Sequence, residues 1–173
     1  MAKSFLNNHK VRGLRNNNPG NLIRTSSAWQ GKIPYGQSKD LKFEQFTDVL
    51  FGLRAMYKDL INDINKGKNT VKKLIYEYAP PNENDTDLYI SKVCKSIGVK
   101  PDDVITTVNN QFLTLLGRAI IKVELGTYHI EITDANLNDA LLLLGDVSTS
   151  KLTVTIKKGY KFLPVLAFLL FFF

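Results

Sequence analysis

The acidic residue best placed for chemistry is Glu124, at the end of a strongly patterned apolar segment. It lies four residues after Ile120 and eight after Leu116, so it continues the apolar face of a helix. Partial burial and the negative end of the helix dipole both disfavour a carboxylate there, so we expect a raised pKa. A glutamic acid that stays protonated near neutral pH can protonate the leaving oxygen of a glycosidic bond. The alternative is a frayed terminal glutamate paired with Lys122 or Arg118.

A second set of polar side chains lies in segment 79–86, where two consecutive prolines stiffen the backbone. Asn84, Asp85 and Thr86 can cap a following helix or hydrogen-bond to a ligand. Capping by itself accounts well for Asp85. Glu83 has no such structural duty, so we predict that it binds sugar or assists a water molecule.

Asparagines dominate the turn-rich segment 15–21, and a tryptophan follows it. The side chains concerned are Asn16, Asn17, Asn18 and Asn21, and then Trp29. Asparagine tolerates left-handed backbone, so a cluster of turns explains the pattern without any ligand. The amides also offer donors and acceptors that suit the N-acetyl and hydroxyl groups of amino sugars, and an indole can stack on a sugar face. The segment is therefore a candidate substrate-binding wall, with simple packing as the alternative.

Four helices must position these side chains. In each predicted helix, apolar residues recur at three- and four-residue spacing, and capping residues or glycines mark the ends. The helices run from Thr47 or Asp48 to Ile64, from Thr70 to Tyr78, from Asp85 or Thr86 to Ile97, and from Phe112 to the residue before Gly126. The last carries a stripe formed by Phe112, Leu115, Leu116, Ala119, Ile120 and Val123. Alternating residues over Leu41–Phe46 predict a short strand or extended piece.

The pattern changes after Gly126. Tyr128–Ile132 and Leu152–Ile156 alternate as strands do, and they flank a short apolar helix, Leu137–Leu144. Residues 162–173 are all apolar, too short a run to cross a bilayer core of roughly 30 Å. With lysines before it, this tail can insert part-way, so we predict burial in a membrane or against a partner. The alternative is a buried terminal strand or helix.

These observations predict a mainly α (α+β) fold: a small domain of about four to five helices with a short extended segment. We divide the chain into a polar N-terminal arm (1–10), the helical domain (11–126), a mixed strand and helix segment (127–159) and the apolar tail (160–173). A chain of 173 residues suffices for one domain with a modest extra segment.

Composition narrows the chemistry. Cys94 is the only cysteine and His9 and His129 are the only histidines, which excludes an intrachain disulfide and argues against a zinc amidase or endopeptidase. We therefore expect no metal and no organic cofactor. The net charge of +7 is spread along the chain, so we expect no specific nucleic-acid partner, although it favours approach to polyanionic walls. The first fifteen residues lack the apolar run of a signal peptide, so we expect export by another route, such as carriage inside a virion.

Five strings occur in order over residues 12–126: RGLRNNNPGNLI, WQGK, FEQFTDVLFGLRAMYKDL, TVKKLIYEYAPPNENDTDLYISKV and LLGRAIIKVELG. Together they resemble a family of phage and prophage proteins described as virion structural proteins or as lytic transglycosylase-like, peptidoglycan-degrading enzymes. The resemblance implies a lysozyme-like fold for residues 11–126. It also implies a location in the virion, on its capsid or membrane, and action in the host cell envelope.

The resemblance also implies site residues. Segment 15–21 would form one wall of the site, and Asn82–Thr86 with Tyr89 would form another. Glu124 falls on the glutamate that ends the last helix of the family. Relatives have Glu-Asn-Gly there, whereas this chain has Leu125 between Glu124 and Gly126.

The expected activity is cleavage of the β-1,4 bond between N-acetylmuramic acid and N-acetylglucosamine in peptidoglycan, when a phage enters or leaves its host. Glu124 would be the general acid and then the base. A transglycosylase needs no second carboxylate, whereas in a hydrolase Glu83 or Asp85 would hold a water or stabilise the oxocarbenium ion. The alternative is a non-catalytic virion protein that binds glycan, capsid proteins or the viral membrane, the last two through its tail.

Overall fold

The computed structural model describes residues 4–145. Within that range the elements are α1 (Arg12–Arg15), α2 (Val49–Asn65), α3 (Val71–Tyr78), α4 (Thr86–Ile97), α5 (Asn110–Leu125), the 3-10 helix η1 (Gly126–Glu131) and α6 (Asp134–Leu144). This range contains isolated bridges but no strand. Two of the bridges, Ile23 with Phe43 and Lys32 with Phe46, hold the extended piece predicted at 41–46. The predicted mainly α fold is confirmed.

The helices begin where their capping residues predict. The side chains of Asp48 and Asp85 accept hydrogen bonds from the backbone N–H groups of Leu50 and Leu88, at 2.8 Å and 3.1 Å. Each bond satisfies an N–H that the first turn of a helix leaves unpaired. Gly98 ends α4 with a φ of +73°, a conformation that glycine adopts without strain.

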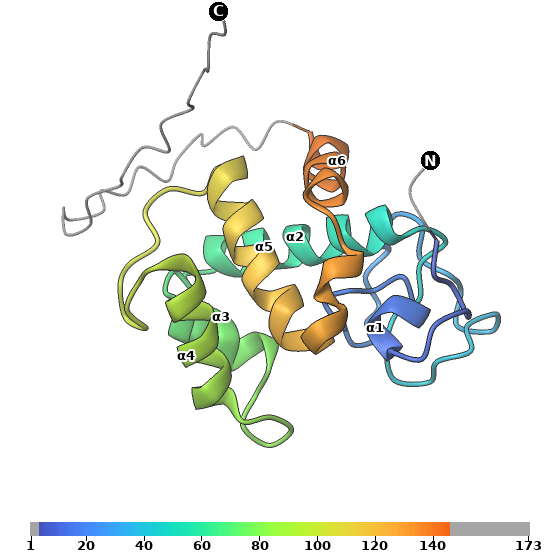
Figure 1. Ribbon diagram of the computed structural model, residues 1–173, viewed down its shortest axis with the longest axis horizontal. Helices are drawn as coiled ribbons and strands as arrows, with labels where there is room; N and C mark the ends of the chain where they lie inside the picture. The colour runs from blue at the N-terminus through green and yellow to red at the C-terminus, as the bar shows by residue number, and fades with distance from the viewer. Residues whose placement is uncertain (1–3, 146–173) are drawn as a thin grey trace, which may run out of the picture.

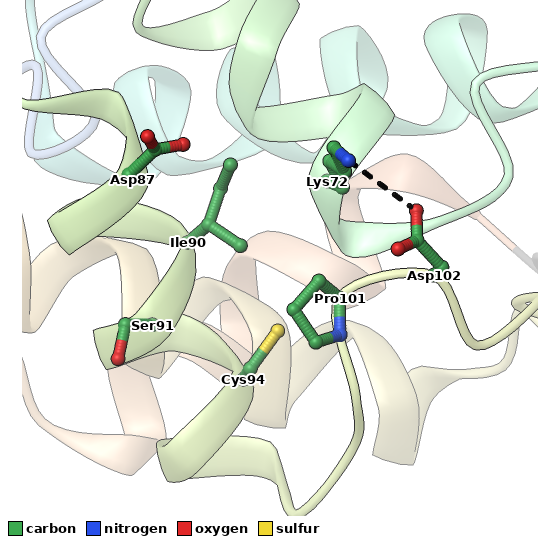
Figure 2. Close-up of a pocket in the computed structure, with 7 residues that line it drawn as sticks. All are labelled: Lys72, Asp87, Ile90, Ser91, Cys94, Pro101 and Asp102. Atoms are coloured by element: carbon green, nitrogen blue, oxygen red, sulfur yellow. Dashed lines mark ion pairs between the residues drawn. The ribbon is translucent and has the colours of Figure 1, made fainter.

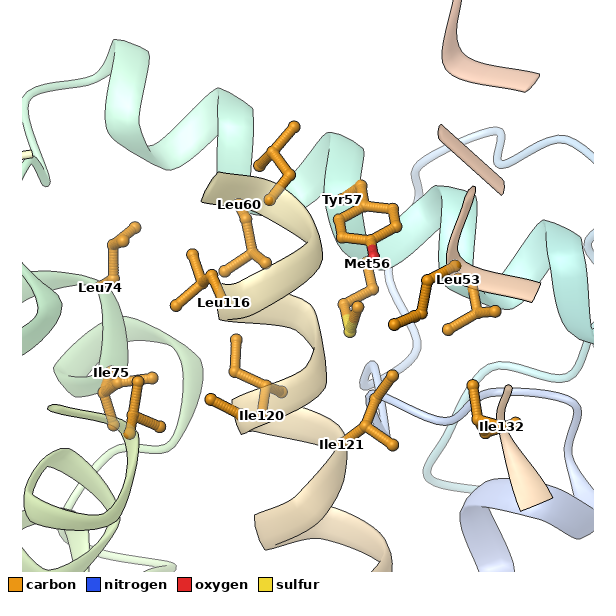
Figure 3. Packing of buried hydrophobic residues seen from close by; sticks show 14 of the residues in the cluster. Leu53, Met56, Tyr57, Leu60, Leu74, Ile75, Leu116, Ile120, Ile121 and Ile132 are labelled. Atoms are coloured by element: carbon orange, nitrogen blue, oxygen red, sulfur yellow. The ribbon is translucent and has the colours of Figure 1, made fainter. Parts of the chain in front are cut away.

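Helix α5 is the centre of the molecule. In Figure 1 it passes between the α3–α4 pair on one side and α1 with the irregular N-terminal segment on the other, while α6 lies near α2. Figure 3 shows the core between these helices, with Leu53, Met56, Tyr57 and Leu60 of α2 facing Leu116, Ile120 and Ile121 of α5. This packing fixes the C-terminal turn of α5, and with it the position of Glu124.

The apolar surface of α5 is wider than the predicted stripe. Leu113 and Ile121 are fully buried although they lie outside that stripe, and Leu115, which belongs to it, is 43% exposed. The prediction for Leu115 is therefore wrong. The physical reason is that α5 contacts α1, α2, α4 and α6, so it is covered on more faces than a surface helix would be.

The strand predicted at Tyr128–Ile132 is also wrong. Most of that segment belongs to η1, in which Ile130 is 72% exposed and Ile132, just after it, is 1% exposed. No partner strand lies beside it in the described range. Instead Thr133 and Asn136 form a capping box that starts α6 immediately afterwards. The short helix predicted at Leu137–Leu144 is confirmed as part of α6.

One core includes residues from both ends of the described range. Phe5 is 5% exposed, and Ile132, Leu137 and Leu141 join the same apolar cluster as α2 and α5. The strand predicted at Leu152–Ile156 and the apolar tail at 160–173 lie outside the described residues. Within residues 4–145, no helix has the length and apolar character that crossing a membrane requires.

Candidate active site

Glu124 lies in the last turn of α5 and is held by side chains from two distant parts of the chain. Its Oε1 accepts a hydrogen bond from the Tyr89 hydroxyl at 2.8 Å, and its Oε2 accepts one from Nδ2 of Asn21 at 2.8 Å. Tyr89 comes from α4, and Asn21 comes from the asparagine-rich turn, 103 residues earlier in the sequence. The tertiary fold therefore brings one residue of each predicted wall, Asn21 and Tyr89, to the predicted acid.

Burial raises the pKa of Glu124 above its ordinary value, and the hydrogen bonds from Asn21 and Tyr89 oppose that shift. The net direction is upward, as the sequence predicts, with burial as the largest cause. A low-dielectric environment disfavours the carboxylate, and the two donors keep it accessible. Such a group can give up a proton and take it back, which is what an acid that later acts as a base requires.

Two tyrosines, Tyr78 and Tyr89, lie near this carboxyl group. The Tyr78 hydroxyl donates to the backbone carbonyl of Gly20, and Tyr89 donates to Glu124. Burial first, and then the nearby Glu124, raise the pKa of both phenols well above the ordinary value. Both hydroxyls therefore stay protonated and act as donors. A side chain at Gly20 would meet Met56 at 2.9 Å as well as the Tyr78 hydroxyl, so this turn requires glycine.

Asn21 is in the left-handed conformation, with a φ of 48°. In the described part of the chain its Oδ1 is buried and has no hydrogen-bond partner, while its Nδ2 donates to Glu124. Rotation of the amide by half a turn would present Oδ1 to a protonated Glu124 as an acceptor. The same side chain can therefore bond to either protonation state of the acid.

Asn16, Asn17 and Asn18 have another role. All three are fully buried. Asn17 accepts from the backbone N–H of Phe5 at 2.9 Å, Asn18 donates to the Leu22 carbonyl at 3.0 Å, and Asn16 donates to Asp40 at 2.8 Å. Their predicted contact with sugar does not fit this burial, because their amides already hold the surrounding loops together. Asn21 is the member of the set that reaches the acid.

The polar side chains that follow α3 all have partners other than Glu124. Glu83 forms an ion pair with Lys42 at 2.7 Å, Asn84 donates to the Pro80 carbonyl at 3.3 Å, and Asp85 caps α4. Glu83 is not among the residues hydrogen-bonded to Glu124. The structure thus places Glu83, the predicted second carboxylate, in an exposed ion pair, whereas Glu124 is partly buried.

Trp29 packs half-buried against a small second cluster formed by Leu22, Phe46 and Ala55. Tyr78 packs against the same cluster, which connects the indole to the wall beside Glu124. The packing interpretation accounts for this contact, and the predicted stacking on sugar stays a prediction.

The sequence does not predict the unusual environment of Asp59. Burial and the neighbouring Asp63 raise the pKa of Asp59, on α2, to about 6, and its charge also acts on Tyr78. The spacing of apolar residues around Asp59 does not predict this shift, because the packing of the other elements determines how much water reaches that position.

Two hollows of the described surface are lined by residues other than Glu124. Figure 2 shows one of about 390 Å³ beside α4, lined by Asp87, Ser91 and Cys94 and bordered by the Lys72–Asp102 ion pair at 3.9 Å. Its lining carries one lysine and two aspartates. Within residues 4–145, no three histidine, cysteine or acidic side chains gather in a way that could hold a metal ion.

The molecule is thus a small helical protein with a partly buried, hydrogen-bonded glutamic acid at the end of its central helix. Over 96 residues its chain is 34% identical to Protein P5 of Pseudoalteromonas phage PM2. The match covers 53% of this chain and 59% of the relative, so the chain spans about three fifths of the relative's length. No family model matches the chain. The chain is therefore related to a bacteriophage protein, and the name of that protein states no activity.

Proposed function

We propose that this chain is a virion-associated phage enzyme that cleaves the β-1,4 bond between N-acetylmuramic acid and N-acetylglucosamine in peptidoglycan. The observation that carries the proposal is the partly buried Glu124, whose pKa is raised and whose two oxygens are held by Asn21 and Tyr89. The similarity to a phage protein supports the virion setting.

In the first step Glu124 donates its proton to the oxygen that bridges the two sugars. The bond between that oxygen and the anomeric carbon breaks, and positive charge develops on the sugar ring. The Tyr89 and Asn21 donors then hold the glutamate anion. In the second step this anion takes a proton from an attacking hydroxyl, whose oxygen bonds to the anomeric carbon, and the acid is regenerated.

The attacking hydroxyl decides the product. A hydroxyl of the same sugar gives an anhydro end, and water gives a reducing end. A hydrolase usually positions a second carboxylate for the water or for the ring charge. Glu83 is bound to Lys42, and Asp85 is used as a helix cap. Because both of these acids already have structural partners, the transglycosylase route, which needs no second carboxylate, is favoured.

The direct test is release of soluble muropeptides from purified peptidoglycan. We expect wild type to release fragments with anhydro ends and Glu124→Gln to release at least about a hundredfold fewer, since a positioned general acid contributes about that much or more. Glu83→Gln is the matched control and should keep most of the activity.

If the wild type releases fragments with reducing ends, the reaction is hydrolysis and the transglycosylase route is wrong. If the folded wild type releases nothing, the enzymatic proposal fails, and a structural virion component that binds glycan or other virion parts becomes the better interpretation.

A further inference from the structure

A basic groove lies beside the candidate active site. Its volume is about 700 Å³, and its lining includes Lys92, Lys95 and Ser96 of α4, Lys122 of α5, and Thr127 and His129 of η1. Among the described residues that line it, no side chain is acidic. We call this hollow the lysine groove.

The three lysines are not neutralised by the fold. The ion pairs of the described residues involve other cations, and Lys92, Lys95 and Lys122 are in none of them. All three are exposed, and they converge from two helices that pack together. Like charges gathered without a counter-ion repel one another, so an anion placed among them would be favoured.

The lysine groove and the carboxyl site are built on the same two helices, α4 and α5. Lys92 follows Tyr89 by three residues, so it lies one turn further along the same face of α4. Lys122 and Val123 directly precede Glu124 on α5, and Gly126 directly follows Leu125. One helical turn is about 5.4 Å, so a ligand longer than a single sugar can reach from the neighbourhood of Tyr89 to Lys92.

We propose that the lysine groove binds the carboxylate groups of the peptide stems that hang from the glycan strand at Glu124. This inference rests on the proposed function, because the glycan has to lie at Glu124 for its stems to reach the groove. Lysine ammonium groups bind carboxylates as point charges on flexible stems, which suits peptides of variable conformation. Ser96 and Thr127 add hydroxyl groups at the same surface.

Binding is measured by co-sedimentation of the full chain with purified sacculi, in a Glu124→Gln background so that nothing is cut. The groove variant combines Lys92→Gln, Lys95→Gln and Lys122→Gln. The control variant combines Lys58→Gln, Lys73→Gln and Lys100→Gln, three exposed lysines elsewhere that are likewise in no ion pair of the described range. Both variants remove the same charge.

We expect the groove variant to bind sacculi about tenfold more weakly than the control variant, as three partly exposed charge pairs would give. Glycan strands freed of their peptide stems should bind the unsubstituted background as weakly as whole sacculi bind the groove variant. Thermal unfolding should be alike in both triple variants, because all six lysines are exposed.

Equal binding by the two triple variants overturns the inference, and so does undiminished binding to stem-free glycan. If the groove variant loses binding only to sacculi that retain teichoic acid, the groove binds phosphate. If it loses binding only to anionic phospholipid vesicles, the groove binds a membrane. Either result overturns the proposal. If wild type cuts nothing but stem-dependent binding persists, the proposed enzyme fails and the lysine groove stands.

Discussion

At the scale of single residues, Glu124 is held in a balance between burial and hydrogen bonding. Burial disfavours its charge, while Asn21 and Tyr89 each stabilise that charge through a donor. Hydrogen bonds to a charged group are worth more than neutral ones, so removing one donor should change the titration of the acid measurably.

Tyr89→Phe removes one donor and keeps the ring. The pKa of Glu124 should then rise further, because an interaction that lowers it is lost. Cleavage needs the protonated acid, so the alkaline limb of the pH profile of kcat/KM should move to higher pH. Tyr76→Phe is the control, since Tyr76 bonds to Asp87 at 3.4 Å on the surface. An unchanged alkaline limb in Tyr89→Phe would contradict this role for Glu124.

Relative to wild type, the Glu124→Gln variant should become more stable as pH rises. The folded-state pKa of Glu124 lies above its ordinary value of 4.5, so the folded state holds the proton more tightly than the unfolded state does. That contribution is present below the ordinary value and is lost as pH rises through the folded-state pKa. The Tm of Glu124→Gln minus that of wild type should therefore increase as pH rises above the ordinary pKa of 4.5.

Glu83→Gln provides the comparison for that experiment, because Glu83 is on an exposed ion pair. Its Tm difference from wild type should vary little over the same range. A difference for Glu124→Gln that shrinks with pH would mean that the folded-state pKa is lowered.

At the scale of elements, the asparagine-rich turn is fixed by close contact with α2. Gly52 of α2 lies so near the turn that a Cβ there would collide with the carbonyl oxygen of Asn17 and meet its carbonyl carbon at 2.9 Å. Asn17 in turn hydrogen-bonds to Phe5 and to the Phe46 carbonyl. The helix and the turn therefore act as one unit that carries Asn21.

Gly52→Ala should destabilise the protein by about 3 kcal/mol, at the upper end of the cost of overpacking, since the colliding atoms are backbone atoms that cannot rotate away. Because the turn carries Asn21, activity should fall in the fraction that remains folded. Gly36→Ala is the control, as a Cβ there meets nothing within 4 Å. Denaturant unfolding measures both, and equal stability would show that the turn yields easily.

At the scale of the whole molecule, residues 4–145 share one core although the sequence suggests a boundary at Gly126. α6 packs on α2, and Leu137 and Leu141 are buried in the cluster that includes Leu53 and Ile121. A segment joined in this way should unfold together with the helices that position Glu124.

Leu137→Ala should lower the free energy of unfolding by about 2 to 5 kcal/mol, the usual range for a fully buried leucine. The transition should stay single. Leu142→Ala in the same helix is the control, because Leu142 is 75% exposed. If Leu137→Ala instead splits the transition in two, α6 is an independent unit.

The periodicity of the sequence determined the helices, because capping residues such as Asp48 and Asp85 and the spacing of apolar residues act locally. It also indicated Glu124, since a glutamate in register with Ile120 and Leu116 at a helix end has to lie close to the core. Local signals failed at Tyr128–Ile132. The alternating pattern there is a 3-10 turn, because α6 begins at once and residues 4–145 offer no partner strand.

Only the tertiary structure decided which polar side chains meet. Asn16, Asn17, Asn18 and Asn21 are alike in sequence, yet three are buried as scaffold and one reaches Glu124 across 103 residues. Glu83 and Glu124 are likewise the same residue type. Glu83 forms an exposed ion pair with Lys42, whereas Glu124 is partly buried and hydrogen-bonded to α4 and to the N-terminal turn. The reason is physical: burial and long-range hydrogen bonds depend on how all the elements pack, and no window of sequence contains that information.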